Sequence, residues 1–341
     1  MKSLKDYSLN LKEQDYHDYP AWSYSIIAKY ARDGFGSLPT LHDKTKVTPA
    51  MEFGSLFDSI LTRGKDTLND YVVSDASVPE AERNALEYIA SCTEAPTFDS
   101  LDKEYIYNRA TEAGYQKNWG ADAKYKHLAP YKSYYNALKS EKKLVSREDW
   151  DDAVDMARAF RSDEYLSKIF GTTNTNDIEY IYQAQFLVPW YIDGKDVNIK
   201  IMPDLLIVNH AEKTVQPVDL KSSSAPAALG FTESFLKFRY DIQAELYTDV
   251  LEKVICGDPD YCEYTILPYL FTDISRVDKV PVSFVYDPKP GLSFTKNDRT
   301  YTYRGWQDIL TEILNYEEQH AKVPSYITLD GPNDLRELLS R

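Results

Sequence analysis

The chain has 341 residues, 43% of them apolar and 27% charged, a balance that is typical of a folded globular protein and excludes global disorder. Asp and Glu outnumber Lys and Arg by 54 to 39, which gives a formal net charge of −15. This acidity excludes a protein that coats nucleic acid with a uniformly basic surface, so a polyanionic partner would have to meet a local basic patch.

Cysteine content and apolar runs indicate the compartment. The three cysteines, Cys92, Cys256 and Cys262, are too few for a disulfide scaffold and favour a reducing environment. The first 20 residues lack the apolar stretch of a signal peptide, and no run of 18 apolar residues occurs in the chain. We therefore expect a soluble, cytoplasmic protein that makes no membrane contact.

Residues 1–75 favour helices. One helix is expected over residues 23–32 and a stronger one over 49–62, with Thr48 as its N-cap and Pro49 in its first turn. Apolar residues of the second segment recur at helical spacing, namely Phe53, Leu56, Phe57, Ile60 and Leu61. This pattern predicts an amphipathic helix with one buried face.

The remaining chain alternates between helical and strand-like patterns. Residues 76–175 predict helices at 80–92, 130–143 and 147–169, the last with Ser146 before its first turn. Residues 176–260 predict consecutive antiparallel strands at 178–188, 197–202, 205–208 and 215–221, followed by a helix over 232–254. Residues 261–341 predict strands at 263–273 and 280–286 and a helix over 303–321. Together these elements indicate one α/β domain over residues 1–341, with helical additions.

The most specific chemical pattern is Pro203-Asp204, followed after 14 residues by Asp219-Leu220-Lys221. Side chains alternate across a strand, so Asp219 and Lys221 share a face while Leu220 points to the core. A short connection over residues 209–214 would fold the second strand back and bring Asp204 beside Asp219. Two carboxylates and a lysine at one end of a sheet form a hard-oxygen site for Mg²⁺, of the kind that phosphodiester hydrolysis needs.

The alternative is a solvated strand face, since Asp-x-Lys is a common pattern. Two features argue against it. The flanking residues are strongly apolar, which is typical of a central strand, and an unpaired Asp204 within such a strand would cost several kcal/mol.

With these residues the chain resembles the PD-(D/E)xK nuclease superfamily, and within it the RecB-like and RecE-type (exodeoxyribonuclease VIII-like) phage exonucleases. The resemblance implies a central mixed β-sheet flanked by helices. It also implies a metal site made by Asp204, Asp219 and the carbonyl of Leu220, with Lys221 as a catalytic residue.

A second element of the resemblance is a Gln-x-x-x-Tyr motif on the helix after the catalytic lysine. Here Gln243 and Tyr247 are four residues apart and share a helix face. The motif begins 22 residues after Lys221, and it implies that both side chains position the metal site or the DNA.

A third element is the early helix, where RecE-type sequences carry Gly-x-x-x-His. Here Gly54 is followed four residues later by Asp58 in place of the His. An Asp supplies a harder, anionic ligand that suits Mg²⁺ or Mn²⁺. Glu52 is the second acid on this helix, and the alternative is that Asp58 is a boundary carboxylate without a catalytic role.

A DNA surface is expected where the acidic chain is locally basic. Residues 117–147 hold eight basic residues, opposed only by Asp122 and Glu141. Tyrosines and Trp119 are interleaved with them, as in surfaces that bind phosphates and unpaired bases. The DNA-contacting residues expected are Lys124, Lys126, Lys132, Lys142, Lys143, Lys237 and Arg239. The alternative is a solvated helix face in a tyrosine-rich protein.

The leading functional hypothesis is a Mg²⁺-dependent DNA exonuclease that hydrolyses phosphodiester bonds at the ends of linear duplex DNA. The resemblance implies a role in phage-type recombination, alongside a single-strand annealing protein and as a homo-oligomer, in the host cytoplasm. The alternatives are a structure-specific endonuclease of the same superfamily and a catalytically inactive nuclease fold that binds DNA.

Overall fold

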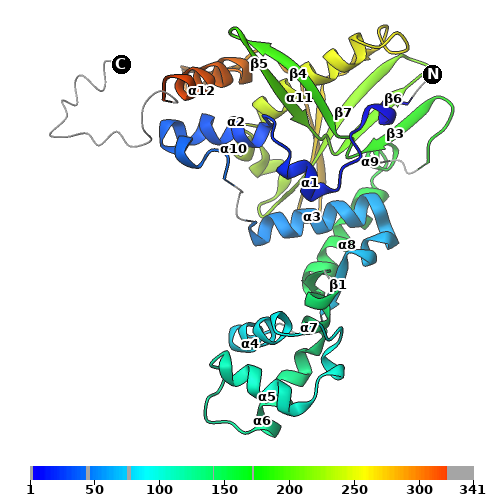
Figure 1. Ribbon diagram of the computed structural model, residues 1–341. Coiled ribbons are helices and arrows are strands. Elements are labelled where there is room, and N and C mark those ends of the chain that lie inside the picture. The colour runs from blue at the N-terminus through cyan, green and yellow to red at the C-terminus, as the bar shows by residue number, and fades with distance from the viewer. Residues whose placement is uncertain (1–2, 44–46, 75–77, 141, 171–172, 321–341) are drawn as a thin grey trace, which may run out of the picture.

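A mixed β-sheet of six strands forms the centre of the protein (Figure 1). The computed structural model describes residues 3–43, 47–74, 78–140, 142–170 and 173–320. The strand order is β10-β9-β7-β6-β3, with β8 beside β7. The strands are β3 (Ile178–Tyr182), β6 (Leu205–Asn209), β7 (Thr214–Ser223), β8 (Thr265–Ile266), β9 (Tyr269–Ser275) and β10 (Pro281–Tyr286). The α/β class with a central mixed sheet flanked by helices is therefore confirmed.

Helices cover both faces of this sheet. On one face lie α2 (Tyr24–Asp33), α10 (Ala227–Phe238), α11 (Tyr240–Cys256) and α12 (Trp306–His320), in a hydrophobic core with Val208, Val215 and Phe271. On the other lie α3 (Pro49–Arg63) and α8 (Arg147–Ser162), in a second core with Leu205, Val218 and Leu270. Sheet residues are apolar on both faces because both are buried.

The hairpin of β6 and β7 places the expected site. The two strands are antiparallel, as the sequence predicts, and Leu205 lies opposite Val218. On its other side β7 runs parallel to β9, with Lys221 opposite Asp273. The strand β7 is thus central, with paired neighbours on both sides.

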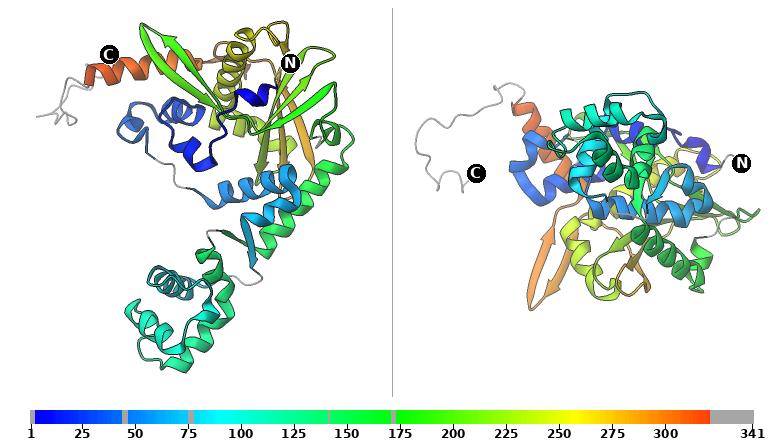
Figure 2. Two further views of the ribbon diagram at one scale, coloured as in Figure 1. Left: turned by 45° about the vertical axis from the view of Figure 1, so that its right-hand side comes forward. Right: turned by 90° about the horizontal axis from the view of Figure 1, so that it is seen from below.

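A helical lobe projects from the sheet domain (Figure 2). It consists of α4 (Glu80–Ser91), α5 (Lys103–Glu112), α6 (Ala121–Leu128) and α7 (Lys132–Lys139). It has its own hydrophobic core, which includes Leu86, Phe98, Ile106 and Tyr135. A parallel pair of short strands, β1 (Tyr71–Ser74) and β2 (Lys143–Ser146), joins the lobe to α8.

Two antiparallel hairpins and short helices complete the fold. The hairpins are β4 (Phe186–Ile192) with β5 (Lys195–Ile201), and β11 (Leu292–Lys296) with β12 (Arg299–Tyr303). The short helices are α1 (Glu13–Asp18), α9 (Leu166–Ile169) and the 3-10 turns η1 (Leu4–Tyr7), η2 (Gly34–Thr40), η3 (Gly64–Asn69), η4 (Phe98–Ser100) and η5 (Ala129–Tyr131). Among the described residues, no helix is long and apolar enough to cross a membrane.

Two expected elements are interrupted by left-handed residues. The prediction of a single strand over 178–188 is wrong, because Gln183, at φ 50°, separates β3 from β4. The strand β4 pairs with β5 outside the central sheet. The single helix over 232–254 is two helices, α10 and α11, which meet at Arg239 with φ 60°. Neither residue is a glycine, so turn composition gave no signal for these breaks.

Other boundaries differ at segment ends. The helix expected over 130–143 ends at Lys139, and residues 143–146 are β2. The helix expected over 147–169 ends at Ser162, with α9 as a separate turn. The last helix begins at Trp306 and not at residue 303, because Arg299–Tyr303 is a strand; residue 321 lies outside the described part. The helix over 49–62 is confirmed, with the Thr48 side chain accepting from the Met51 amide.

Candidate active site

Asp204 and Asp219 lie at one end of the β6–β7 hairpin. Asp204 directly precedes β6, and the register that pairs Leu205 with Val218 puts it across from Asp219. The Asp204 Oδ2 atom accepts a 2.7 Å hydrogen bond from the Leu220 amide. The antiparallel hairpin therefore brings the two carboxylates together, as the spacing predicts.

Asp219, Lys221 and Gln243 form one connected network. The Lys221 ammonium lies 2.7 Å from Asp219 Oδ2 and donates to Gln243 Oε1 at 3.2 Å. The Gln243 amide nitrogen donates to Asp219 Oδ1. Asp219 and Gln243 are buried, so this network is shielded from water and each member holds the others in place.

Tyr247 and Tyr240 support this network from α11. Tyr247 lies one turn beyond Gln243 and is buried, and its hydroxyl hydrogen-bonds the backbone of Met202, just before Pro203-Asp204. Burial raises the pKa of Tyr247 well above its usual value, so the phenol stays neutral. The Tyr240 ring lies 4.5 Å from the Lys221 ammonium, a cation–π contact on the other side of the lysine.

Asp58 approaches the same strand ends from α3. Its Oδ2 atom accepts a 2.6 Å hydrogen bond from the Gln183 side chain. The backbone N–H of Gln183 donates to the backbone carbonyl of Asp204 at 3.1 Å. Gly54, one turn earlier, allows the close approach of α3, since a Cβ atom there would lie 3.3 Å from Ser222 Oγ. Glu52 is exposed and lies away from the three Asp residues, on the wall of a cavity described below.

The charges of this site are unbalanced. Burial, together with the carboxylates of Asp219 and Asp58, raises the pKa of Asp204 well above its usual range. Burial alone would lower the pKa of Lys221, but the ion pair with Asp219 outweighs it, so the pKa of this lysine is raised and its ammonium stays protonated. Among the described residues of this site, Lys221 is the cation that faces Asp204 and Asp219, and its ion pair is with Asp219.

The donor set fits a hard divalent cation. Asp58, Asp204 and Asp219 offer carboxylate oxygens, the ligands that Mg²⁺ prefers, and the excess negative charge is what such an ion would neutralise. Each carboxylate is held by a protein donor, and within the described part of the chain no three Asp, Glu, His or Cys side chains are arranged so that they could hold a metal ion.

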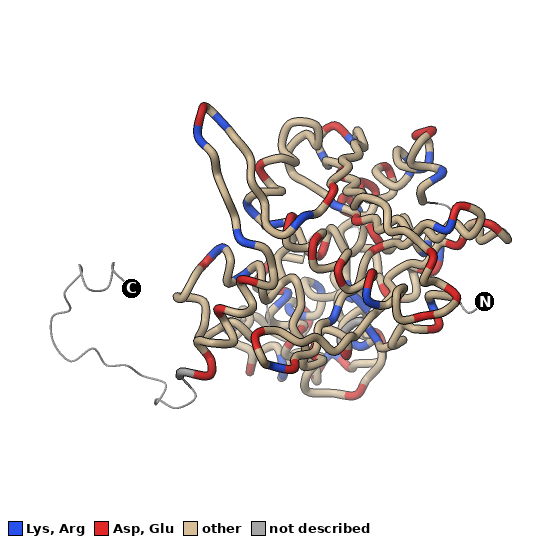
Figure 3. Tube along the Cα trace, turned by 90° about the horizontal axis from the view of Figure 1, so that it is seen from above, with Lys and Arg blue, Asp and Glu red and all other residues tan. Residues whose placement is uncertain are grey.

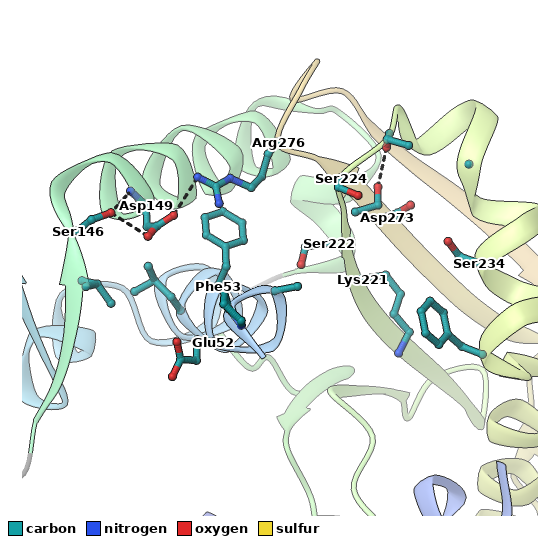
Figure 4. A pocket seen from close by; sticks show the side chains of 18 of the residues that line it. Glu52, Phe53, Ser146, Asp149, Lys221, Ser222, Ser224, Ser234, Asp273 and Arg276 are labelled. Carbon is teal, nitrogen blue, oxygen red and sulfur yellow. Dashed lines mark hydrogen bonds and ion pairs between the residues drawn. The ribbon is translucent and has the colours of Figure 1, made fainter. Parts of the chain in front are cut away.

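A cavity of about 630 Å³ opens beside Lys221 (Figure 4). Its walls come from the start of α3, from β2, from α10 and from the end of β7. Lys221 lies on its wall, whereas Asp204, Asp219 and Asp58 do not. The lysine is therefore the link between the carboxylate site and the cavity.

The lysines and arginine expected to contact DNA are placed differently from one another. Lys124 is buried and donates to Thr111 at 2.7 Å, and Arg239 is buried in a two-pronged ion pair with Asp241. Neither side chain therefore presents an exposed cation in this structure. Lys132 is exposed but paired with Asp99, and Lys142 donates to the Leu68 carbonyl. Lys126, Lys143 and Lys237 are exposed and their ammonium groups have no ion-pair or hydrogen-bond partner among the described residues, and Lys143 lines the cavity. The Lys143 ammonium lies 5.8 Å from the centre of the Tyr71 ring, and that of Lys237 lies 5.2 Å from the centre of the Phe238 ring.

The aromatic residues of the same segment are largely structural. Tyr115 and Tyr135 are buried in the core of the helical lobe, and Tyr125, Tyr131 and Tyr134 pack against it. Their interleaving with lysines follows from the amphipathic helices of the lobe. Glu141, counted as one of the two opposing acids, lies outside the described residues.

Three residues of the site were missed by sequence reasoning. Gln183 joins Asp58 to Asp204. In the sequence, it could have been found as a polar residue within an aromatic, β-rich stretch. Tyr240 covers Lys221 and stands three residues before Gln243 in the sequence. Asp273 lies opposite Lys221 across the sheet and lines the cavity, but nothing in its local sequence marks it.

Comparison with known proteins adds little to this geometry. No family model and no curated protein matches the chain. Eight chains of solved structures match, among them the crystal structure of SSO0001, with 12% identity over 81% of this chain and 89% of that chain. Its TM-score of 0.28 is too low to support an argument about fold or function.

Proposed function

We propose that this protein is a metal-dependent deoxyribonuclease of the PD-(D/E)xK type, an exonuclease that hydrolyses phosphodiester bonds at the ends of linear duplex DNA. The observation that carries the proposal is the network of the buried Asp219 and Gln243 with the partly exposed Lys221, beside Asp204 and on the wall of a cavity. A lysine held in this way faces an adjacent space that part of a substrate can enter.

The metal would be held by Asp58, Asp204 and Asp219, with the Leu220 carbonyl as a further ligand. Mg²⁺, or Mn²⁺ in its place, would polarise the phosphate and acidify a bound water. The carboxylates that now accept from Gln183, the Leu220 amide and Lys221 supply the hard oxygens for this role.

The residues of the chain have separate tasks in hydrolysis. A water oxygen bonds to phosphorus, the bond to the leaving oxygen breaks, and the proton of the water ends on that oxygen or in solvent. Lys221, protonated beside Asp219, orients the water and stabilises the negative charge that develops on the phosphate. Gln243 fixes the positions of the Lys221 and Asp219 side chains relative to each other. Tyr247 holds the backbone just before Asp204 in place through its hydrogen bond with Met202.

The cellular role follows from the same resemblance. We propose that the enzyme processes DNA ends in phage-type recombination, with a single-strand annealing protein as partner and as a homo-oligomer. Lys143 beside the cavity and Lys237 at the end of α10 are exposed cations suited to the DNA backbone.

The test compares the wild type with Lys221→Ala and Asp219→Ala on linear and circular duplex DNA, each with Mg²⁺ or with EDTA. We expect the wild type to degrade linear DNA in Mg²⁺ only, and both variants to lose at least a hundredfold in rate because each removes a group that acts in the transition state. Lys213→Ala is the matched control, since Lys213 lies in the turn of the same hairpin and pairs with Glu263 at the surface.

Cleavage of covalently closed circles would favour the endonuclease alternative. Full activity of both alanine variants would show that the site is elsewhere. A second candidate function is a DNA-binding module without catalysis, favoured by the fact that each carboxylate already has a protein donor. That candidate predicts DNA binding by the wild type without cleavage in Mg²⁺ or Mn²⁺.

A further inference from the structure

We propose that the cavity beside Lys221 binds one unpaired nucleotide at the end of a DNA strand, with its base stacked on Phe238. This inference rests on the proposed nuclease function and narrows its substrate to ends whose last nucleotides are not base-paired. The cavity is separate from the carboxylate site and shares Lys221 with it.

A base has a platform in this cavity. Phe238, at the end of α10, is 38% exposed, whereas Phe53 and Phe231, which also line the cavity, are buried. Its ring stacks on Tyr240 with 5.7 Å between ring centres, and Tyr240 contacts the Lys221 ammonium. A base stacked on Phe238 would therefore be connected to Lys221, the side chain proposed to face the reacting phosphate, through the Phe238 and Tyr240 rings.

The polar groups of the cavity favour a base or sugar over a phosphate. Asp273 is 1% exposed and lines the cavity, and its Oδ1 atom accepts no hydrogen bond from the described residues. A buried carboxylate repels a phosphate but accepts from the N–H groups of a base or the hydroxyl of a sugar. Ser222, Ser224 and Ser234 add neutral hydrogen-bonding groups around it (Figure 4).

The size and the rim of the cavity suit a nucleotide. A volume of about 630 Å³ lies within the range of pockets that enclose small ligands. Arg276 on the rim is neutralised by Asp149 and Asp152, whereas Lys143 is exposed and free of acidic partners among the described residues. Lys143 can therefore meet the backbone phosphate of a strand whose base has entered. A base inside a duplex cannot enter, because its faces are covered by its neighbours.

The experiment measures binding of the full-length protein in EDTA, where metal-dependent cleavage is absent. The probes are a blunt duplex, the same duplex with three unpaired nucleotides at one end, and that frayed duplex with its unpaired bases removed. We expect Phe238→Ala to weaken binding of the frayed probe about tenfold, and to leave the blunt and abasic probes unchanged. Phe238→Trp should retain wild-type affinity, because the larger ring still stacks.

Leu229→Ala is the matched control, since Leu229 is an apolar residue of the same helix, 80% exposed, and does not line the cavity. If Phe238→Ala and Leu229→Ala bind the frayed probe equally well, the inference is overturned, whether or not the wild type cleaves DNA. If binding depends on Phe238 but DNA is not cleaved in Mg²⁺ or Mn²⁺, the nucleotide site stands and the nuclease proposal fails. Absence of binding to all three probes overturns the nucleotide site, and cleavage in Mg²⁺ or Mn²⁺ decides the nuclease proposal separately.

Discussion

Gln243 is the side chain on which the geometry of the proposed site depends most. It donates to Asp219 and accepts from Lys221, so it fixes the distance between a proposed metal ligand and the proposed catalytic lysine. The Gln-x-x-x-Tyr spacing alone predicts that Gln243 and Tyr247 share a helix face. The alternation of side chains along a β-strand likewise predicts that Asp219 and Lys221 point to the same face of β7.

We predict that Gln243→Ala lowers the cleavage rate about ten- to a hundredfold and raises the Mg²⁺ concentration needed for half-maximal rate. Residues that orient metal ligands have effects of this size. The measurement is a Mg²⁺ titration of the rate on linear duplex DNA. Gln307→Ala, on the exposed surface of α12, should behave as wild type. An unchanged rate and Mg²⁺ dependence for Gln243→Ala would remove it from the site.

Other residues of the site could not be predicted, for physical reasons that differ. Asp273 is brought to Lys221 by the parallel pairing of β7 with β9, a long-range contact that leaves no local pattern. Lys124 and Arg239 have the composition of DNA-contacting residues, but a hydrogen bond to Thr111 and an ion pair with Asp241 hold them inside. Whether a cation is exposed depends on packing that a single sequence does not reveal.

At the level of elements, the helix α11 joins the site to the end of the chain. Its second turn carries Glu245, a buried acid that accepts a hydrogen bond from the Gly291 amide before the β11–β12 hairpin. Gly305, after that hairpin, has no room for a side chain, since a Cβ atom would lie 2.6 Å from Glu245 Oε1. Burial is the main cause that raises the pKa of Glu245 from 4.5 to about 7.

This raised pKa gives a pH-dependent stability with a definite sign. Between pH 4.5 and about 7 the unfolded chain has lost the Glu245 proton while the folded protein keeps it, so its contribution to the unfolding free energy falls as pH rises through this window. Glu245→Gln removes this fall. We expect the unfolding free energy of the variant to rise by up to about 3 kcal/mol relative to that of the wild type between pH 4.5 and 8.

The measurement is urea unfolding of both proteins at pH 5 and pH 8, with Glu212→Gln as the surface control. If the unfolding free energies of Glu245→Gln and wild type differ by the same amount at pH 5 and pH 8, the pKa of Glu245 is not raised by folding.

Element boundaries show where sequence patterns are informative. The helix α3 is predicted almost to the residue because its cap, its proline and its apolar stripe agree. The breaks at Gln183 and Arg239 are not predicted, because tertiary contacts hold these residues in left-handed conformations. Arg239, for example, is fixed by Asp241 and by the Arg304 carbonyl.

For the whole molecule, the net charge of −15 limits where DNA can bind. Acidic and basic residues are interspersed along the chain when the protein is seen from above (Figure 3). The helical lobe that the sequence marks as basic has its own core and joins the sheet domain through β1 and β2. The cavity lies at this junction, lined by Lys143 of β2 and Lys221 of β7. We therefore expect DNA binding that is local to this junction and sensitive to salt.

Lys143→Ala should lower the slope of log affinity against log salt by about one unit, because one phosphate contact is lost. The measurement is binding of linear DNA in EDTA over a series of salt concentrations. Lys289→Ala is the control, since Lys289 is exposed and lies away from this cavity. Equal slopes for Lys143→Ala and wild type would place the DNA elsewhere.

The most direct test of the account is the Mg²⁺-dependent release of nucleotides from end-labelled linear duplex DNA by wild type and Lys221→Ala, at equal protein concentration. We predict release by the wild type that EDTA abolishes, and at least a hundredfold slower release by the variant. Intact DNA with the wild type in both Mg²⁺ and Mn²⁺, or equal release by the two proteins, would contradict the proposed active site.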